Sequence, residues 1–226
     1  MMKSPRPVVI AIDGPAGAGK STIAKALAKR LGYSYLDTGA MYRALTLKAL
    51  REKVDLENEA ALVTLANRTQ LDLKGNAQTG LKVFLDGKEV SEAIRSQAVT
   101  NNTFYIARAP AIREIMVQWQ REIGARSSCV VEGRDIGTVV FPQAQFKFYL
   151  DADFIERAQR RIKELRDKGK DVEEAQLKAD LQDRDQKDFS RKVGPLKKAD
   201  GAIVIDSTFL TIDQVVEKIL SHIPGN

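Results

Sequence analysis

The chain has 226 residues, of which 43% are hydrophobic, 29% charged and 6% aromatic, a composition typical of a globular protein. Its apolar runs are far shorter than the roughly 20 residues of a membrane span or the roughly 7–15 of a secretory signal, so we expect a cytoplasmic protein. The single cysteine and single histidine exclude an intramolecular disulfide and a multi-cysteine or multi-histidine metal site. The net charge of +6 lies mostly within residues 1–50 and forms no basic block, which favours a compact anionic ligand over nucleic acid.

Strands and helices alternate along most of the chain, after a terminus at residues 1–6 that we expect to be frayed. Strands are predicted over 8–12, 33–36, 129–131, 146–150 and 202–205. Helices are predicted over 20–31, 40–50, 57–67, 110–123, 154–168, 173–188 and 211–223. This alternation predicts an α/β fold with a parallel sheet, whose ligands bind beyond the carboxyl ends of the strands.

Residues 69–90 depart from this pattern. Apolar and polar side chains alternate there, and Asp86-Gly87 is a typical hairpin turn. We therefore predict a small antiparallel sheet inserted into the α/β chain. Ser91 is expected to cap a short helical segment at 92–95.

Residues 14–21, GPAGAGKS, match the phosphate-loop motif G-x-x-x-x-G-K-[ST] in full, between a predicted strand and a predicted helix. The backbone N–H groups of such a loop and the positive end of the following helix bind phosphate oxygens. Lys20 would reach the β- and γ-phosphates, and the Ser21 hydroxyl would bind Mg²⁺. The motif predicts a nucleoside-triphosphate site without identifying the acceptor. It leaves open whether Asp13 orders the loop or the magnesium waters, and whether Glu132 touches the metal.

Five segments, in this order, resemble the bacterial cytidylate kinases, a family of nucleoside monophosphate kinases. They are DGPAGAGK at 13–20, LDTGAMYR at 36–43, GRDIGT at 133–138, RDQKDFSR at 184–191 and IDST at 205–208. The resemblance implies a P-loop NTPase three-layer fold with a parallel five-stranded sheet, a monophosphate-binding insertion with a small antiparallel sheet, and a short lid. It implies one kinase domain with its core at 7–37, 104–152 and 190–226, the insertion at 38–103 and the lid at about 153–189.

The implied reaction is Mg²⁺-assisted, in-line transfer of the γ-phosphate of ATP to CMP or dCMP, giving CDP or dCDP. No general base is needed, because the accepting phosphate oxygen is already ionised at neutral pH. We expect a monomer whose partners are these small molecules, with neither nucleic acid nor a membrane involved.

The resemblance also assigns roles to individual residues. The residues expected to bind ATP are Gly14, Pro15, Ala16, Gly17, Ala18, Gly19, Lys20, Ser21, Thr22 and the lid arginines Arg157 and Arg161. Arg160 is a further lid arginine, and Ser21 is expected to bind the metal. Thr38, Arg43, Arg134 and Arg191 fall around the monophosphate, Arg184 and Asp188 at the sugar, and Arg113 and Asp135 at the base. Lys20, Arg134 and Arg191 are expected to act in the transfer itself.

The base assignment agrees with the chemistry of cytosine. A carboxylate accepts from the N4 amino group, and an arginine donates to N3 and O2, whereas uracil would mispair with both. Phe104 departs from the family pattern, which commonly has a serine there to contact the base, and Lys187 stands where an arginine often occurs.

Other interpretations remain at this point. The acceptor could be UMP, AMP or a small alcohol such as shikimate, or the chain could be a phosphate-loop module that holds nucleotide as a switch. Arg134 and Asp135 could simply pair with each other. The helical spacing of Arg184, Asp188 and Arg191 is also that of a solvated, salt-bridged stripe.

Overall fold

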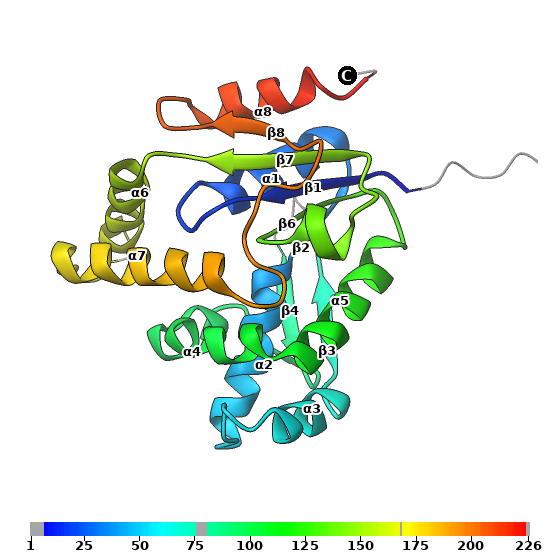
Figure 1. The fold of residues 1–226 in the computed structure, drawn as a ribbon, viewed down its shortest axis with the longest axis vertical. Coiled ribbons are helices and arrows are strands. Elements are labelled where there is room, and N and C mark those ends of the chain that lie inside the picture. Colours follow the sequence, from blue (N-terminus) through cyan, green and yellow to red (C-terminus); the bar gives the residue numbers. More distant parts are fainter. Residues whose placement is uncertain (1–6, 76–80, 168, 225–226) are drawn as a thin grey trace, which may run out of the picture. The chain divides into compact units, whose positions relative to one another are not determined.

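The computed structural model describes residues 7–75, 81–167 and 169–224 (Figure 1). The expectation for residues 1–6 therefore lies outside the described residues. The chain divides into two compact units. One comprises residues 28–131 with residues 1–8, and the other comprises residues 9–27 and 132–226. The five-stranded sheet has the strand order β2-β6-β1-β7-β8, and a three-stranded sheet has the order β3-β4-β5.

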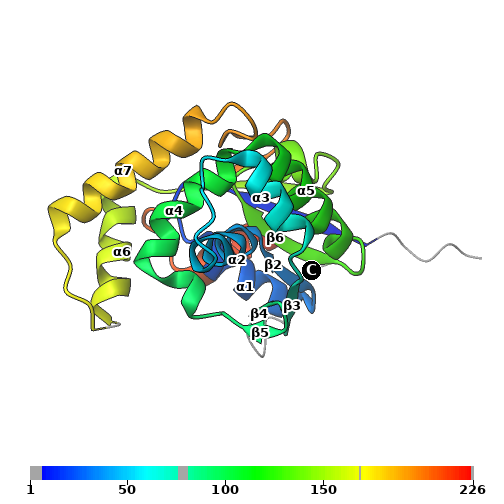
Figure 2. The ribbon, with the colours of Figure 1, turned by 90° about the horizontal axis from the view of Figure 1, so that it is seen from below.

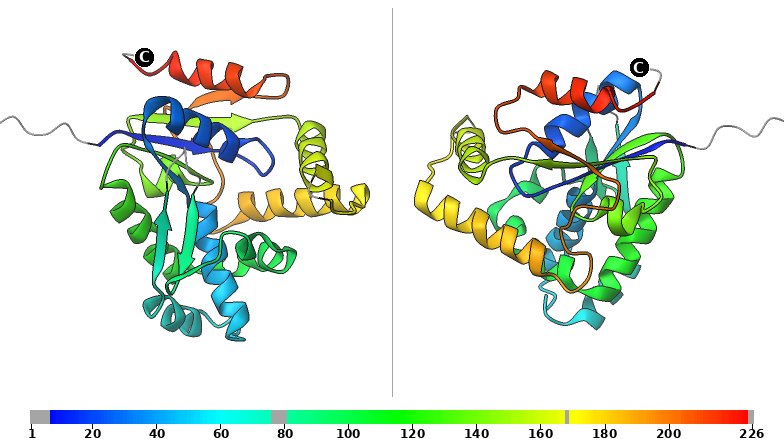
Figure 3. Two further views of the ribbon diagram at one scale, coloured as in Figure 1. Left: turned by 180° about the vertical axis from the view of Figure 1, so that it is seen from behind. Right: turned by 45° about the horizontal axis from the view of Figure 1, so that its top comes forward.

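The unit of residues 9–27 and 132–226 contains three strands of the larger sheet: β1 (Val9–Asp13), β7 (Phe146–Asp151) and β8 (Ile203–Asp206). They pair in parallel, with Ile10 opposite Phe146 and Leu150 opposite Ile205. All five residues of β1 are buried, as expected for a strand covered on both faces. Figure 3 shows that the carboxyl ends of these strands point to the same side.

Helices of this unit follow the carboxyl ends of its strands. The phosphate loop leads from β1 into α1 (Lys20–Leu31), β7 leads into α6 (Phe154–Asp167), and β8 leads into α8 (Ile212–Leu220). A capping box between Thr211 and Gln214 begins α8. Helix α7 (Glu174–Ser190) lies beside α6, as Figure 2 shows.

The unit of residues 28–131 begins with the last residues of α1 and contains the elements from β2 to the first part of β6. In chain order they are β2 (Ser34–Asp37), α2 (Thr38–Arg51), α3 (Glu59–Asn67), β3 (Leu71–Lys74), β4 (Lys82–Leu85), β5 (Lys88–Glu89), the 3₁₀ turn η1 (Ala93–Arg95), α4 (Gln97–Arg108), α5 (Pro110–Gly124) and β6 (Cys129–Gly133). Its small antiparallel sheet packs on α2, where Ala40, Ala44 and Leu47 share a core with Val83 and Leu85.

The predicted α/β fold, the five-stranded sheet and the antiparallel insert are confirmed, and Asp86-Gly87 does turn β4 into β5. The prediction that Ser91 caps the 92–95 segment is wrong. Its hydroxyl accepts from the Val83 N–H and donates to Glu89, so it joins the small sheet instead. Helix α4 and a π-helical turn, η2 (Ile136–Val140), were not anticipated from the sequence.

Candidate active site

The phosphate loop between β1 and α1 is held tightly against β7. Gly14, Gly17 and Gly19 have φ angles of 151°, 79° and 90°, which side-chain-bearing residues rarely adopt. A Cβ on Gly14 would lie 2.0 Å from the carbonyl oxygen of Leu150, so only glycine fits where the chain leaves the sheet. The positive φ angles and this close approach explain the glycines of the motif.

Lys20 turns back over the loop. Its Nζ donates to the carbonyl oxygen of Pro15 at 2.6 Å, and the side chain is buried. Burial, followed by the charge of Arg134, holds the pKa of Lys20 well below its ordinary value, while Glu132 opposes that shift. A phosphate group in this position would relieve the cost of the buried cation, because it would supply the missing negative charge.

Asp13, the last residue of β1, accepts backbone N–H bonds from Ile136 and Gly137, both at 2.8 Å. Burial raises the pKa of its carboxyl group to about 6, against the lowering effect of these two hydrogen bonds. Its carboxylate therefore holds the start of η2 in place. Asp13 thereby orders the segment that immediately follows Arg134 and Asp135.

Arg134, Asp188 and Arg191 lie close together. Arg134 Nε donates to Asp188 Oδ2 at 2.7 Å, and an Arg191 nitrogen lies 3.7 Å from Asp188 Oδ1. Burial opposes ionisation of Asp188, yet the charges of Arg134, Arg191 and Arg184 keep its pKa below the ordinary value. Asp188 thus holds Arg134 within a cluster of positive charge. Arg134 therefore pairs with Asp188.

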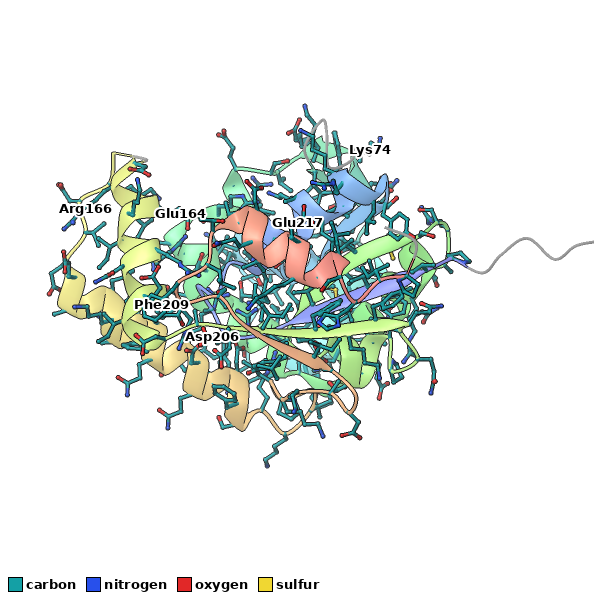
Figure 4. The ribbon with its side chains drawn as sticks, turned by 90° about the horizontal axis from the view of Figure 1, so that it is seen from above. Lys74, Glu164, Arg166, Asp206, Phe209 and Glu217 are labelled. Carbon is teal, nitrogen blue, oxygen red and sulfur yellow. The ribbon has the colours of Figure 1, made fainter. Side chains whose placement is uncertain are left out.

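The three arginines of α6 have different surroundings. Arg157 is buried and donates to the carbonyl oxygen of Ala16 at 2.8 Å and to Asp185 at 2.5 Å. Arg160 donates to the carbonyl oxygens of Ser207 and Thr208. Arg161 pairs with Glu164, which is labelled on α6 in Figure 4. Only Arg157 of the three is therefore buried, whereas the side chains of Arg160 and Arg161 are 29% and 34% exposed.

The loop after β8 touches the phosphate loop, which the sequence did not reveal. The Ser207 hydroxyl lies 3.3 Å from the carbonyl oxygen of Ala18 and 3.0 Å from that of Asp151. Asp206, labelled in Figure 4, accepts from the Thr208 N–H at 2.9 Å and folds this loop. The IDST segment therefore supports the back of the phosphate loop.

The unit of residues 28–131 carries its own polar group at the start of α2. Asp37 caps this helix by accepting from the Ala40 N–H at 2.8 Å, and its second oxygen accepts from Arg43 at 3.0 Å. Thr38 is the first residue of the helix and is buried. Among the described residues, Arg43 Nε has no hydrogen-bond partner. A helix N-terminus and an arginine with a spare donor form a surface suited to an anion.

Arg113 is the largest fully buried side chain of this unit. It donates to the carbonyl oxygen of Ala107 at 3.1 Å and lies 5.7 Å from the ring of Tyr42. Phe104, the departure from the family pattern, packs edge-on against Tyr105. Its neighbour Thr103 donates to the carbonyl oxygen of Val99 at 2.7 Å within α4.

Comparisons with known proteins agree with these features. The sequence profile of the cytidylate kinase family matches residues 10–225. The chain belongs to the cytidylate kinase family. It is 49% identical to a cytidylate kinase of Caldanaerobacter subterraneus, over 97% of this chain and 96% of that protein, and 51% identical to one of Anoxybacillus flavithermus, over 94% of each.

A solved structure of an uncharacterized protein from Eubacterium ventriosum covers 97% of this chain and 99% of its own, with a TM-score of 0.51 and 13% identity. That likeness concerns the fold alone. Within the described residues, none of the helices combines the length and the apolar character that a membrane crossing requires.

Proposed function

We propose that this chain transfers the γ-phosphate of ATP to CMP and dCMP in a Mg²⁺-dependent reaction. Its membership of the cytidylate kinase family supports phosphorylation of CMP. The observation that carries the proposal is one unit holding both a phosphate loop and the Arg134–Asp188–Arg191 cluster. Such a combination suits a reaction between two groups that are both negatively charged.

In the proposed mechanism, the loop of residues 14–21 and Thr22 binds the triphosphate through backbone N–H groups. Lys20 neutralises charge on the transferring phosphoryl group. Arg134 and Arg191 neutralise charge on the same group and on the accepting phosphate, which Thr38 and Arg43 would also bind. Arginine suits this task because it stays charged and binds phosphate through two donors. No general base takes part, since positioning and charge neutralisation supply the catalysis.

Mg²⁺ would be held by Ser21 together with phosphate oxygens. The Ser21 hydroxyl lies in the first turn of α1 on an exposed side chain, which fits a metal that keeps several water ligands. When bound, Mg²⁺ would supply positive charge that offsets the negative charge of the phosphate groups.

Asp135 and Arg113 are proposed to select cytosine, and Arg184 and Asp188 to bind the sugar. Asp135 follows the strand that ends at Gly133, and Arg113 is buried on α5. Arg157 and Arg161 are proposed to assist ATP binding. We also propose that the protein is a cytoplasmic monomer.

The test is an ADP-release assay with Mg²⁺ and ATP against CMP, dCMP, UMP, AMP and GMP. We expect rapid turnover with CMP and dCMP and little with the others. Equal turnover with UMP would show that Phe104 has loosened base selection. ATP binding without turnover of any nucleotide would favour a phosphate-loop switch and overturn the proposal, and a panel extended to shikimate would test a small-alcohol acceptor.

A further inference from the structure

A buried ion pair lies against the phosphate loop, and its formation was not expected from the sequence. Arg157 of α6 and Asp185 of α7 are 2.5 Å apart, and each side chain is about a tenth exposed. Arg157 Nε also donates to the carbonyl oxygen of Ala152 at 3.1 Å, which fixes the guanidinium at the start of its own helix. The pair therefore joins the two helices at one buried point.

Both ends of the pair bind one residue of the phosphate loop. The Ala16 N–H donates to Asp185 Oδ1 at 3.2 Å, and the Ala16 carbonyl oxygen accepts from Arg157 at 2.8 Å. Ala16, Arg157 and Asp185 thus close a ring of three contacts. The ring uses the backbone donor and the backbone acceptor of Ala16 at once, so it fixes the orientation of the peptide groups on both sides of that residue.

Packing around the ring leaves the loop little freedom. A Cβ on Gly17 would lie 3.0 Å from the Cβ of Arg157, so the loop backbone touches α6 directly. Ala16 shares an apolar cluster with Ala158 of α6 and Leu181 of α7. The ring and this cluster hold Ala16 and Gly17 of the loop against α6 and α7.

We propose that Asp185 is a positioning residue for ATP, acting through Arg157 and Ala16 to hold the phosphate loop in its binding shape. The inference rests on the proposed function, because it assigns Asp185 to the ATP half of that reaction. Backbone N–H groups bind phosphate well only when they are already aimed at it, so loss of the ring weakens ATP binding before it affects CMP. Arg157 then serves ATP through the loop rather than by direct contact.

The experiment compares Asp185→Ala and Asp185→Asn with the matched control Asp183→Ala. Asp183 lies on the same helix and pairs with Lys187, but both side chains of that pair are exposed. We expect Asp185→Ala to raise the KM for ATP about 10- to 100-fold while the KM for CMP stays within about twofold. Asp185→Asn keeps an acceptor for the Ala16 N–H and should recover part of the loss. Asp183→Ala should have the same KM for ATP and for CMP as the parent chain.

Direct binding of ADP without CMP gives a readout independent of turnover, and it should weaken in parallel with the KM for ATP. Thermal unfolding with saturating ADP checks that each variant is folded. If Asp185→Ala fails to fold, Arg157→Lys takes its place, because it keeps the charge but gives up the planar donor that spans Ala16 and Asp185.

A double-mutant cycle separates indirect from direct action. If Arg157 acts through the ring, Arg157→Ala and Asp185→Ala have similar effects that do not add. Additive losses, or equal losses for ATP and CMP, would overturn the inference, as would an Asp185→Ala variant that behaves like Asp183→Ala. An inactive parent chain would instead contradict the proposed function, and ADP binding would still test the role of Asp185.

Discussion

Asp188 on α7 accepts a 2.7 Å hydrogen bond from Arg134 Nε, so one carboxylate orients an arginine that lies just after β6. Because the bond uses Nε, it fixes the plane of the guanidinium and leaves one edge to other partners. Arg134 also donates to the carbonyl oxygen of Gly133 at 3.3 Å. The arginine is therefore preorganised, which is the condition for charge stabilisation at low reorganisation cost.

Replacing Arg134 should separate transfer from ATP binding. We expect Arg134→Ala to lower kcat by about 10³-fold or more, since an arginine that stabilises the transferring phosphoryl group contributes on that order. The dissociation constant for ATP, measured by calorimetry, should change less than about threefold, because the phosphate loop that is proposed to bind ATP is unaltered. Arg166→Ala, which removes an exposed arginine paired with Glu174, is the control and should be silent. Unchanged turnover in Arg134→Ala would remove this residue from the site.

Replacing Asp135 should alter the choice of base. In Asp135→Asn the amide offers a donor where cytosine N4 needs an acceptor, and it can also donate to O4 of uracil. We expect the ratio of kcat/KM for CMP to that for UMP to fall by about 5- to 100-fold, as measured with both nucleotides under the same conditions. A ratio equal to that of the parent chain would refute the assignment of Asp135 to the base.

Removing Mg²⁺, or removing the Ser21 hydroxyl that is proposed to bind it, should slow phosphoryl transfer. Excess chelator should abolish turnover of the parent chain, and added Mg²⁺ should restore it. In Ser21→Ala we expect the Mg²⁺ concentration for half-maximal rate to rise about 10-fold, the loss expected for one hydroxyl ligand. Ser221→Ala, at the exposed end of α8, is the control. A Mg²⁺ titration that is the same in both variants would exclude Ser21 as a ligand.

Asp13 should make the free energy of unfolding depend on pH. Its folded pKa of about 6 lies above the ordinary 3.8, so the folded state binds its proton more tightly than the unfolded state does. The stability it contributes is therefore highest at low pH and is lost as the pH rises from about 4 to about 6. Relative to Asp13→Asn, the parent chain should lose about 1 kcal/mol between pH 5 and pH 7, measured by urea unfolding. A constant difference between the two across this range would contradict the raised pKa.

Gly14 and Gly87 offer a matched test of close packing. Both have positive φ, but a Cβ on Gly87 would meet no atom within 4 Å, whereas one on Gly14 would clash with Leu150. Gly87→Ala should lower the free energy of unfolding by only about 1 kcal/mol, the cost of a positive φ in a residue that carries a Cβ. Gly14→Ala should cost several times that, about 3 kcal/mol or more, and should also weaken ATP binding. Equal losses of unfolding free energy in the two variants would mean that β7 moves away from the new Cβ at no energetic cost, and would contradict the prediction.

Much of the fold could be predicted because its signals are local. The bounds of α1 follow from the motif before it and from Gly32 after it, and the β4–β5 hairpin follows from Asp86-Gly87. Helix α4 was missed although it buries Val99, Ile106 and Ala107, because polar residues separate Val99 from the apolar residues at its other end. The prediction for Ser91 was wrong because a serine before a helical segment commonly caps it, whereas here the Ser91 hydroxyl accepts a hydrogen bond from Val83 of β4.

The residues proposed to bind phosphate could be named from the sequence, whereas the contacts that these residues make with the rest of the protein could not. Lys20 is identified by the motif, and Arg134 by the family resemblance. Asp185 was passed over because its contact with Ala16 joins residues 169 positions apart, and nothing in its helical surroundings marks it as buried. Arg157 was assigned to ATP binding by the family resemblance, and its hydrogen bond to the Ala16 carbonyl oxygen could not be foreseen from the sequence.

The position of β1 in the sheet has a consequence for synthesis on the ribosome. Both neighbours of β1, β6 and β7, begin no earlier than residue 129, although β1 ends at Asp13. The groups that shape the loop, Leu150 and Asp185 among them, are made later still. The nucleotide-binding segment is therefore among the first to emerge and among the last to find its partners. A nascent chain stalled before residue 185 would carry the whole motif and still lack the ring of contacts that Asp185 and Arg157 make with Ala16.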